Sequence, residues 1–292
     1  MTLPDHQADR VRQLRSDHER GASQLARRAL GFIAEAARDE MFADVAALRT
    51  GLEVFARELE NARPSMVAIE NLVAAWRRDV ATLPDDELAV MRAAFEERAQ
   101  TLVSLSQQAA ERAAARAAAL IPPGATVLTH SLSSTVREVL ASLEGRATLI
   151  FSESRPRLEG HRFGRWLSAA GLSGQLVTDA QIGHFAAQAD VALVGADAVL
   201  GDGSVVNKVG TYLLALAARD HELPFYVCCE SFKHTPRTEN EMSLEEMDPA
   251  ELGAPEMPGI LVRNVYFDVT PARLVSAWVD ERAVRQSPPK AG

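Results

Sequence analysis

The feature that most constrains the fold is a change of hydrophobic period at Pro122-Pro123-Gly124. Before it the chain is rich in Ala, Glu, Arg, Gln and Leu, which are strong helix formers, and residues 18–38 carry apolar side chains at helical spacing. Proline has no N–H group with which to continue a helix. We therefore predict an N-terminal helical domain over residues 1–121 and a second domain over residues 122–292.

After this point short apolar runs alternate with helical stretches. The runs that we interpret as strands are 126–128, 147–151, 175–177, 191–194, 225–228 and 265–269. The helical stretches between them are 134–143, 162–170 and 209–219. Such alternation is typical of βαβ units and a parallel sheet. The predicted fold class is therefore α/β, with an N-terminal helical domain and a C-terminal Rossmann-like parallel-sheet domain.

Two further expectations concern the end of the chain. Residues 235–258 are acidic and contain prolines, so we expect a long exposed excursion there. Thr270 followed by Pro271 is typical of a capped helix start, so we expect a last helix at this position.

Charge and composition exclude several classes of protein. The net charge of −9 argues against direct nucleic-acid binding, which needs a basic surface. No apolar run is long and uncharged enough to span a membrane, and the N-terminus lacks the apolar core of a signal peptide. We interpret the adjacent Cys228 and Cys229 as reduced core residues, with a redox role as the alternative. These features predict a cytoplasmic protein.

The segment between residues 190 and 233 predicts a site for an anionic ligand. Asp197 follows the apolar run at 191–194, and ligands in open α/β sheets bind beyond the carboxyl ends of the strands. We expect a helix to start near Asn207-Lys208, where free N–H groups and a lysine would favour phosphate. Lys233 follows the next strand in the chain. The alternative for Asp197 alone is a turn or helix-capping residue.

Three further segments carry side chains or amides that could bind an anion, although each is a weaker signal. Arg20-Gly21-Ala22-Ser23 lies at a helix start, and Arg63 precedes a rigid proline. The turn from Thr129 to Thr135 holds several hydroxyls and His130 between a strand and a helix. Each also has a plain structural interpretation: a solvated arginine at an ordinary helix start, or a hydroxyl-rich helix cap.

Taken together these segments resemble one family over nearly the whole chain. The matching motifs are RGAS, ARPS, THSLSSTV, SESRP, VGADAVLGDGSVVNKVGT, PFYVCCESFK and NVYFDVTP. The family unites ribose-1,5-bisphosphate isomerases, methylthioribose-1-phosphate isomerases and the regulatory α, β and δ subunits of translation initiation factor 2B. The long block with the later ESFK is the most specific part of the resemblance.

The resemblance implies roles for particular residues. The residues that it implies in phosphate or substrate binding are Arg20, Gly21, Ala22, Ser23, Arg63, Ser133, Ser134, Thr135, Asn207, Lys208 and Lys233. It implies proton transfer by Asp197 and by a cysteine directly after Thr-His, where this chain has Ser131. It also implies a homodimer or a hexamer. We expect the ligand in a cleft between the two domains, and no metal or organic cofactor, because basic side chains and helix N-termini supply the positive field.

The serine leaves three hypotheses open. The first is a sugar-phosphate protein of the ribose-1,5-bisphosphate isomerase type, with Asp197 and Ser131 as the catalytic pair. The second is a non-catalytic regulatory subunit that senses a sugar phosphate or a nucleotide, because a serine hydroxyl is much harder to ionise than a thiol. The third is an isomerase that acts on another phosphorylated sugar with a replacement base, for which His130, Cys228 and Cys229 are the candidates.

Overall fold

The computed structural model describes residues 3–143 and 145–289. The chain divides into two compact units, Met1–Gln108 and Ala109–Gly292. The boundary that we predict after residue 121 stays a prediction. None of the helices described is long and apolar enough to cross a membrane.

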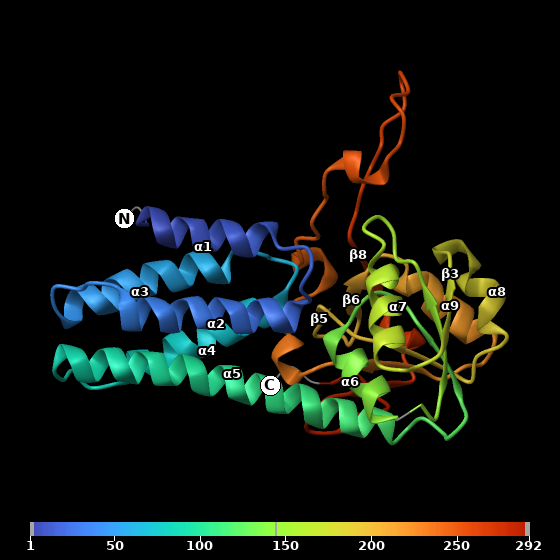
Figure 1. Cartoon of the computed structure of the whole chain (residues 1–292), viewed down its shortest axis with the longest axis horizontal. Helices are drawn as coiled ribbons and strands as arrows, with labels where there is room; N and C mark the ends of the chain where they lie inside the picture. The colour runs from blue at the N-terminus through green and yellow to red at the C-terminus, as the bar shows by residue number, and fades with distance from the viewer. Residues whose placement is uncertain (1–2, 144, 290–292) are drawn as a thin grey trace. The chain divides into compact units, whose positions relative to one another are not determined.

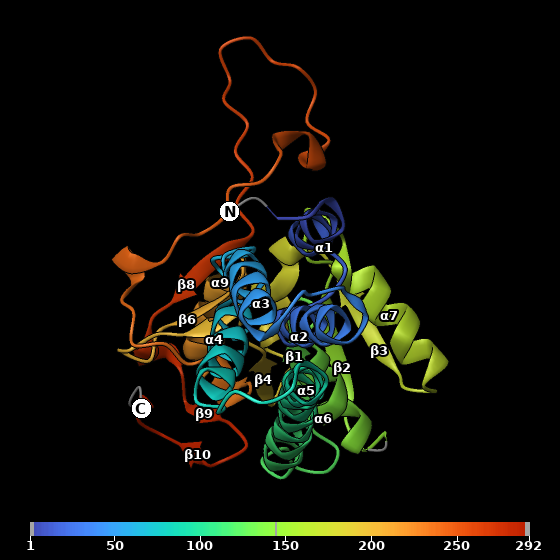
Figure 2. The same cartoon turned by 90° about the vertical axis from the view of Figure 1, so that its left-hand side faces the viewer.

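Unit 1 is helical, as predicted (Figures 1 and 2). Its helices are α1 (Asp5–Ser16), α2 (Ala22–Asp39), α3 (Val45–Glu60), α4 (Val67–Ala81) and α5 (Leu88–Ala118), the last of which continues past residue 108. Helix α2 packs against α3 and α4, and buries Leu25, Ala29 and Ile33 at the predicted helical spacing. Trp76 and Phe95 meet edge to face with ring centroids 5.7 Å apart, which fixes α4 against α5.

Unit 2 is built on a seven-stranded sheet, which confirms the α/β prediction. Its strands are β1 (Thr126–Thr129), β2 (Thr148–Ser152), β3 (Gly174–Val177), β4 (Val191–Val194), β7 (Phe225–Cys228), β9 (Ala277–Val279) and β10 (Val284–Arg285). The order is β10-β9-β7-β4-β1-β2-β3, and every pair is parallel except β9 with β10. This is the open, doubly wound arrangement in which ligands bind at the carboxyl ends of the strands.

Helices cover both faces of this sheet. They are α6 (Ser134–Ser142), α7 (Glu159–Ala169), α8 (Ile182–Ala186) and α9 (Thr211–Asp220), with short 3-10 turns at Asp179–Gln181 and Ser231–Lys233. Side chains of α6 and α7 pack on one face, and those of α8 and α9 pack on the other. Neighbouring residues of β4 therefore point into different cores, since Leu193 faces α6 and α7 whereas Val194 faces α8 and α9.

A second, antiparallel sheet corrects one prediction. It has the order β5 (Ala198–Val199), β6 (Val205–Lys208) and β8 (Phe267–Thr270). Asn207 and Lys208 thus lie in a strand, and the helix that we expected near them begins at Thr211. The reason is the buried pair Val205 and Val206, whose β-branched side chains pack in a sheet. The predicted strand at 265–269 belongs to this small sheet and not to the parallel one.

The predicted last helix is wrong. After Thr270 the chain makes a 3-10 turn over Ala272–Leu274 and then enters β9. Val275, Ala277 and Trp278 are buried, and β9 pairs with β7. The burial of these side chains and the pairing of β9 with β7 and β10 override the cap signal of Thr270 and Pro271.

The acidic segment before β8 is a mostly exposed excursion, as expected, and Figure 1 shows it extending away from the rest of unit 2. It contains 3-10 turns at Glu239–Glu241 and Pro249–Leu252. Its second turn is tied to the segment between β2 and α7. Arg155 donates to the carbonyl of Leu252 at 2.7 Å, and Arg157 pairs with Glu251 at 2.7 Å.

Candidate functional site

The loops after β1 and β4 meet at the carboxyl edge of the parallel sheet. A Cβ atom placed on Gly195 would lie 2.4 Å from Ser133 Oγ, so only glycine permits this approach. The contact brings the hydroxyl-rich turn next to the Gly195-Ala196-Asp197 segment. Asp197 itself is half-buried, and its amide donates to the carbonyl of Val206 at 2.8 Å.

Ser131 has an unusual backbone. Its φ of 69° lies in the left-handed region, and so does the φ of 57° at Ser154. The Ser131 amide donates to Ser154 Oγ at 2.9 Å, which links the loops after β1 and β2. Such strained residues cost about 1–3 kcal/mol each and gather at functional sites. The conformation therefore supports a functional interpretation of Ser131.

A carboxylate that the sequence analysis missed lies beside Ser131. Glu159, the first residue of α7, is buried and accepts a long 3.4 Å hydrogen bond from Ser131 Oγ. Its other oxygen lies 3.0 Å from Lys208 Nζ. Glu159 follows the SESRP motif by three residues, so the motif indicated the right loop but not this side chain.

The three replacement bases considered from the sequence are poorly placed. His130 is buried, and its two ring nitrogens lie 2.6 Å from Ser152 Oγ and 2.8 Å from the carbonyl of Val209. Burial lowers the pKa of His130, which keeps the ring neutral. Cys228 and Cys229 are free and buried, and burial raises the pKa of both thiols. They are therefore core thiols and not thiolate nucleophiles, which agrees with our first interpretation of them.

The chain has only three lysines, and the two in the described part are both buried in unit 2. Lys208 Nζ lies 3.0 Å from Glu159 and 4.2 Å from the ring centre of Tyr266. Lys233 Nζ lies 3.6 Å from Glu230. Buried ammonium groups need such partners because an isolated charge is costly to remove from water. Each lysine thus comes with its own carboxylate.

The remaining predicted residues of unit 2 lie at helix starts. Ser133 caps α6 by accepting from the Val136 amide at 3.3 Å. The first amides of a helix, here those of Ser134 and Thr135, have no partner within the helix. Thr135 Oγ1 is buried without a hydrogen-bond partner among the described residues. Asn207 Nδ2 donates to Thr211 Oγ1 at 3.0 Å, so it stabilises the turn into α9.

The start of α9 is occupied by a carboxylate, contrary to the expectation of a phosphate-binding helix end. Asp268 Oδ2 accepts from the amides of Gly210 at 2.7 Å and Tyr212 at 3.2 Å. Burial raises the pKa of Asp268 to about 6, against the opposing effect of these two hydrogen bonds. Asp268 comes from β8, far along the chain, so no local sequence signal could have placed it here.

In unit 1 the predicted arginines gather around one aspartate. Asp17 pairs with the Arg20 guanidinium and accepts from the Arg20 amide at 3.1 Å. Arg63 Nη1 donates to the carbonyl of Asp17 at 2.9 Å. Gly21 precedes α2 without a capping side chain, and Ser23 Oγ is buried without a hydrogen-bond partner among the described residues. Unit 1 thus places its predicted residues together at the start of α2.

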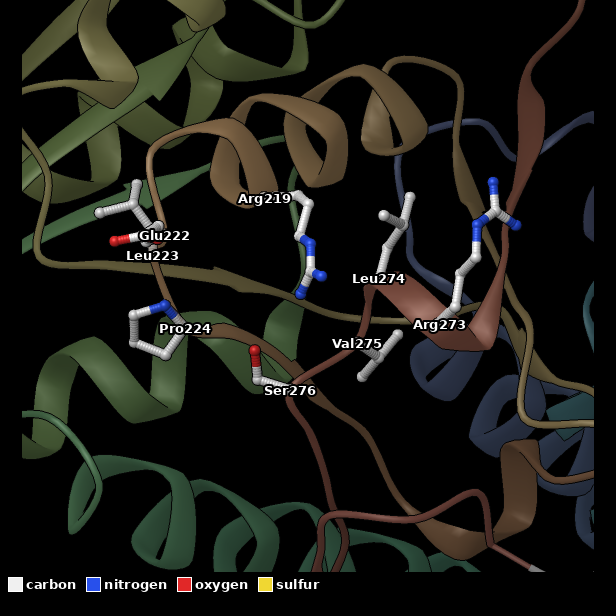
Figure 3. A pocket seen from close by; sticks show the side chains of 8 residues that line it. All are labelled: Arg219, Glu222, Leu223, Pro224, Arg273, Leu274, Val275 and Ser276. Atoms are coloured by element: carbon white, nitrogen blue, oxygen red, sulfur yellow. The ribbon is translucent and has the colours of Figure 1, made fainter.

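A hollow of about 590 Å³ lies elsewhere in unit 2 (Figure 3). It lies at the amino ends of β7 and β9, because Pro224 and Ser276 in its lining directly precede these strands. Arg219 reaches toward its middle and Arg273 points away. None of the predicted site residues lines it. Within residues 3–143 and 145–289, no three His, Cys, Asp or Glu side chains gather as metal ligands.

Comparison with known proteins identifies the family. The sequence profile described as the initiation factor 2 subunit family matches residues 18–285. The chain belongs to this family.

The relatives carry different names. A putative translation initiation factor eIF-2B subunit 2-like protein of Pyrococcus horikoshii is 34% identical, with 97% of both chains covered. A ribose 1,5-bisphosphate isomerase of Archaeoglobus fulgidus is 31% identical over 92% of this chain and 86% of the relative. The crystal structure of a 5-methylthioribose 1-phosphate isomerase from Pyrococcus horikoshii matches with a TM-score of 0.82 at 25% identity. It covers 97% of this chain and 85% of that one. The family resemblance inferred from the sequence motifs is confirmed.

Proposed function

We propose that this protein binds a phosphorylated pentose and converts it from an aldose to a ketose. Two kinds of relative are named as isomerases of phosphorylated ribose derivatives. The observation that carries the proposal is that Ser131 and Lys208 both contact Glu159, in segments that include the loop after β1. Asp197 follows β4, and α/β proteins bind ligands at this carboxyl edge of the sheet.

The phosphate groups need a positive field, and the site residues can supply it without a metal. The residues that we propose for phosphate or substrate binding are Arg20, Gly21, Ala22, Ser23, Arg63, Ser133, Ser134, Thr135, Asn207, Lys208 and Lys233. Lysine and arginine bind phosphate through charge-assisted hydrogen bonds, and helix starts add backbone donors. The net charge of −9 is compatible with this, because a local field can differ in sign from the whole chain.

The reaction requires two groups that move protons. One removes the proton from the carbon next to the anomeric carbon, and the other protonates the ring oxygen as its bond to the anomeric carbon breaks. We assign the second role to Asp197 and the first to Ser131, which occupies the position of the family's cysteine. General acid–base help of this kind contributes about 10²–10⁴-fold to the rate.

The test is to incubate the protein with ribose 1,5-bisphosphate and with methylthioribose 1-phosphate and to follow the ketose by phosphorus NMR. We expect turnover that falls by about 10²-fold or more in Asp197→Asn. Asp220→Asn, an exposed aspartate at the end of α9, is the matched control and should keep full activity. Native turnover that survives in Asp197→Asn would contradict the assigned role.

One alternative is favoured by a specific observation. The relative matched over 97% of both chains is named as an initiation-factor subunit-like protein, and Ser131 replaces the expected thiol. In this case the same site would sense a sugar phosphate or a nucleotide without turning it over, as a regulatory subunit. Tight binding without turnover in the native protein, with activity gained in Ser131→Cys, would support the sensor and exclude the isomerase.

We also propose that the chain forms a homodimer or a hexamer, as the family resemblance implies. Light scattering coupled to size-exclusion chromatography measures this directly. A monomer at micromolar concentration would contradict it.

A further inference from the structure

Glu159 is the side chain that connects Ser131 with Lys208. Its Oε2 accepts from Ser131 Oγ at 3.4 Å, and its Oε1 lies 3.0 Å from Lys208 Nζ. All three belong to different segments, namely the loop after β1, the start of α7 and the end of β6. We infer that Glu159 takes up the hydroxyl proton of Ser131 during catalysis, and that phosphate at Lys208 makes it ready to do so. This inference rests on the proposed isomerase function.

A serine in the position of a cysteine needs a proton acceptor. Within the described residues, Glu159 supplies the only ionisable side chain that is hydrogen-bonded to Ser131 Oγ. His130 is held by Ser152 and Val209 instead. The 3.4 Å distance is long, but catalytic hydrogen bonds are often long without substrate and shorten in the complex. A glutamate base for aldose–ketose isomerisation has a precedent in triosephosphate isomerase.

Contact with Lys208 makes the action of Glu159 as a proton acceptor depend on whether a phosphorylated ligand is bound. The ion pair with Lys208 holds Glu159 Oε1 at 3.0 Å while Oε2 stays 3.4 Å from Ser131 Oγ. Lys208 is also the residue that we propose as a phosphate ligand. A phosphate that shares the ammonium group loosens this ion pair, and the carboxylate can then move closer to Ser131 Oγ. The acceptor thus becomes effective when substrate is bound.

The proton transfers balance without a further reactant. The anomeric carbon of a pentose 1-phosphate carries the phosphate ester, so its bond to the ring oxygen breaks and Asp197 protonates that oxygen. Ser131 Oγ takes the proton from the neighbouring carbon while its own hydroxyl proton passes to Glu159 Oε2. The electron pair of the broken C–H bond forms the carbon–carbon double bond of an enol. In the second half, Glu159 returns its proton to Ser131, and Ser131 delivers one to the carbon that carries the phosphate. The hydroxyl of the neighbouring carbon loses its proton to Asp197 as the ketone forms.

The experiment measures kcat and KM for ketose formation in Glu159→Gln, Glu159→Asp, Ser131→Ala, Ser131→Cys and the double variant Ser131→Cys/Glu159→Gln. We expect Glu159→Gln to lower kcat by about 10²-fold without raising KM, because the amide cannot take up a proton and leaves Lys208 free for phosphate. Glu159→Asp should recover part of the loss. In the Ser131→Cys background, Glu159→Gln should cost less than about fivefold, since a thiol can ionise without this acceptor. Glu222→Gln, an exposed glutamate after α9, is the matched control.

The outcomes separate the inference from the function on which it rests. Turnover by the native protein that is unchanged in Glu159→Gln, or in Ser131→Ala, overturns the inference and leaves the isomerase intact. An equal loss in the serine and cysteine backgrounds shows a structural role and also overturns it. The absence of turnover in the native protein overturns the proposed function, and the inference with it. Thermal unfolding of each variant shows whether a loss of kcat comes from a folded protein.

Discussion

The positively charged candidate residues of the two units differ in how deeply their ion pairs are buried. In unit 1, Arg20 keeps 54% of its side-chain surface exposed and pairs with Asp17, which also accepts from two backbone amides. In unit 2, Lys208 keeps 8% of its side-chain surface exposed and pairs with Glu159, which is also buried. The first pair is screened by water and the second is not.

This difference in exposure determines whether a substitution changes ligand binding only or also changes the stability of the fold. An exposed ion pair contributes about 0–1 kcal/mol to stability, so a ligand can displace one partner at low cost. A buried pair is different, because removing one member leaves an uncompensated charge. We therefore expect substitution of the exposed Arg20 to act on ligand binding alone, and substitution of Lys208 to act on both binding and stability.

The largest expected effect is that of Lys208→Met. It leaves Glu159 buried without its cation, which costs about 3–5 kcal/mol of unfolding free energy, and it weakens binding of any phosphorylated ligand. The double variant Lys208→Met/Glu159→Gln removes both charges and should recover most of the stability but none of the binding. Denaturant titration and calorimetry measure the two effects separately.

Arg77→Met is the matched control for this experiment. Arg77 of α4 pairs with Glu60 and Glu53 of α3 at 2.7 Å and 2.6 Å, and none of the three is a predicted site residue. The Arg77→Met substitution should lower the free energy of unfolding without changing the affinity of the folded protein for phosphate. Undiminished binding by Lys208→Met would remove Lys208 from the proposed phosphate site.

The sequence predicted β1, β2, β3, β4 and β7 of the parallel sheet because their signal is local, but it placed a helix where β9 follows. The run at 191–194 is an uninterrupted apolar strand, and it appears as β4 with these bounds. Asn207 and Lys208 were wrongly assigned to a helix start, because their strand is specified by pairing with β8, some sixty residues later. Val205 and Val206 favour a strand locally, but the local sequence does not show that the strand continues through Asn207 and Lys208 to pair with β8.

The residues of the candidate site show the same limit of sequence-based prediction, which is that distant contacts are not visible locally. Ser131, Asp197 and Lys208 could be named from motifs, since each follows a recognisable strand or turn. Glu159 and Asp268 could not, because their importance comes from what they contact. Glu159 lies beside Ser131 and Lys208 only once three separate segments are folded together. Asp268 reaches the start of α9 from another sheet.

The carboxylates of Asp268 and Asp17 differ in the direction of their pKa shifts. Burial raises the pKa of Asp268 to about 6, whereas burial of Asp17 is outweighed by its bonds to Arg20 and the backbone, and its pKa is lowered. Asp268 therefore contributes stability that is present below pH 4 and is lost as the pH rises through about 6. Asp268→Asn should gain stability relative to the native protein over this range, by at most about 3 kcal/mol.

Asp17→Asn should behave in the opposite way. The lowered pKa of Asp17 means that its contribution is present above the unfolded value near 4 and is lost as the pH falls below it. Its stability deficit should therefore shrink in acid. Unfolding midpoints of both variants between pH 3 and 8 measure the two slopes. Slopes of the same sign would show that the two aspartates do not differ as we describe.

The smallest expected effect is that of Arg20→Ala. The guanidinium is exposed and its pair with Asp17 is worth about 0.2–1 kcal/mol at most, so unfolding should change little. Phosphorylated ligands should bind about two- to fivefold more weakly if Arg20 contributes to phosphate binding as an exposed charge. Arg12→Ala is the matched control, because Arg12 also pairs with an aspartate three residues away in an exposed helix. Equal ligand affinity in both variants, measured by calorimetry, would leave Arg20 as a solvated arginine at an ordinary helix start.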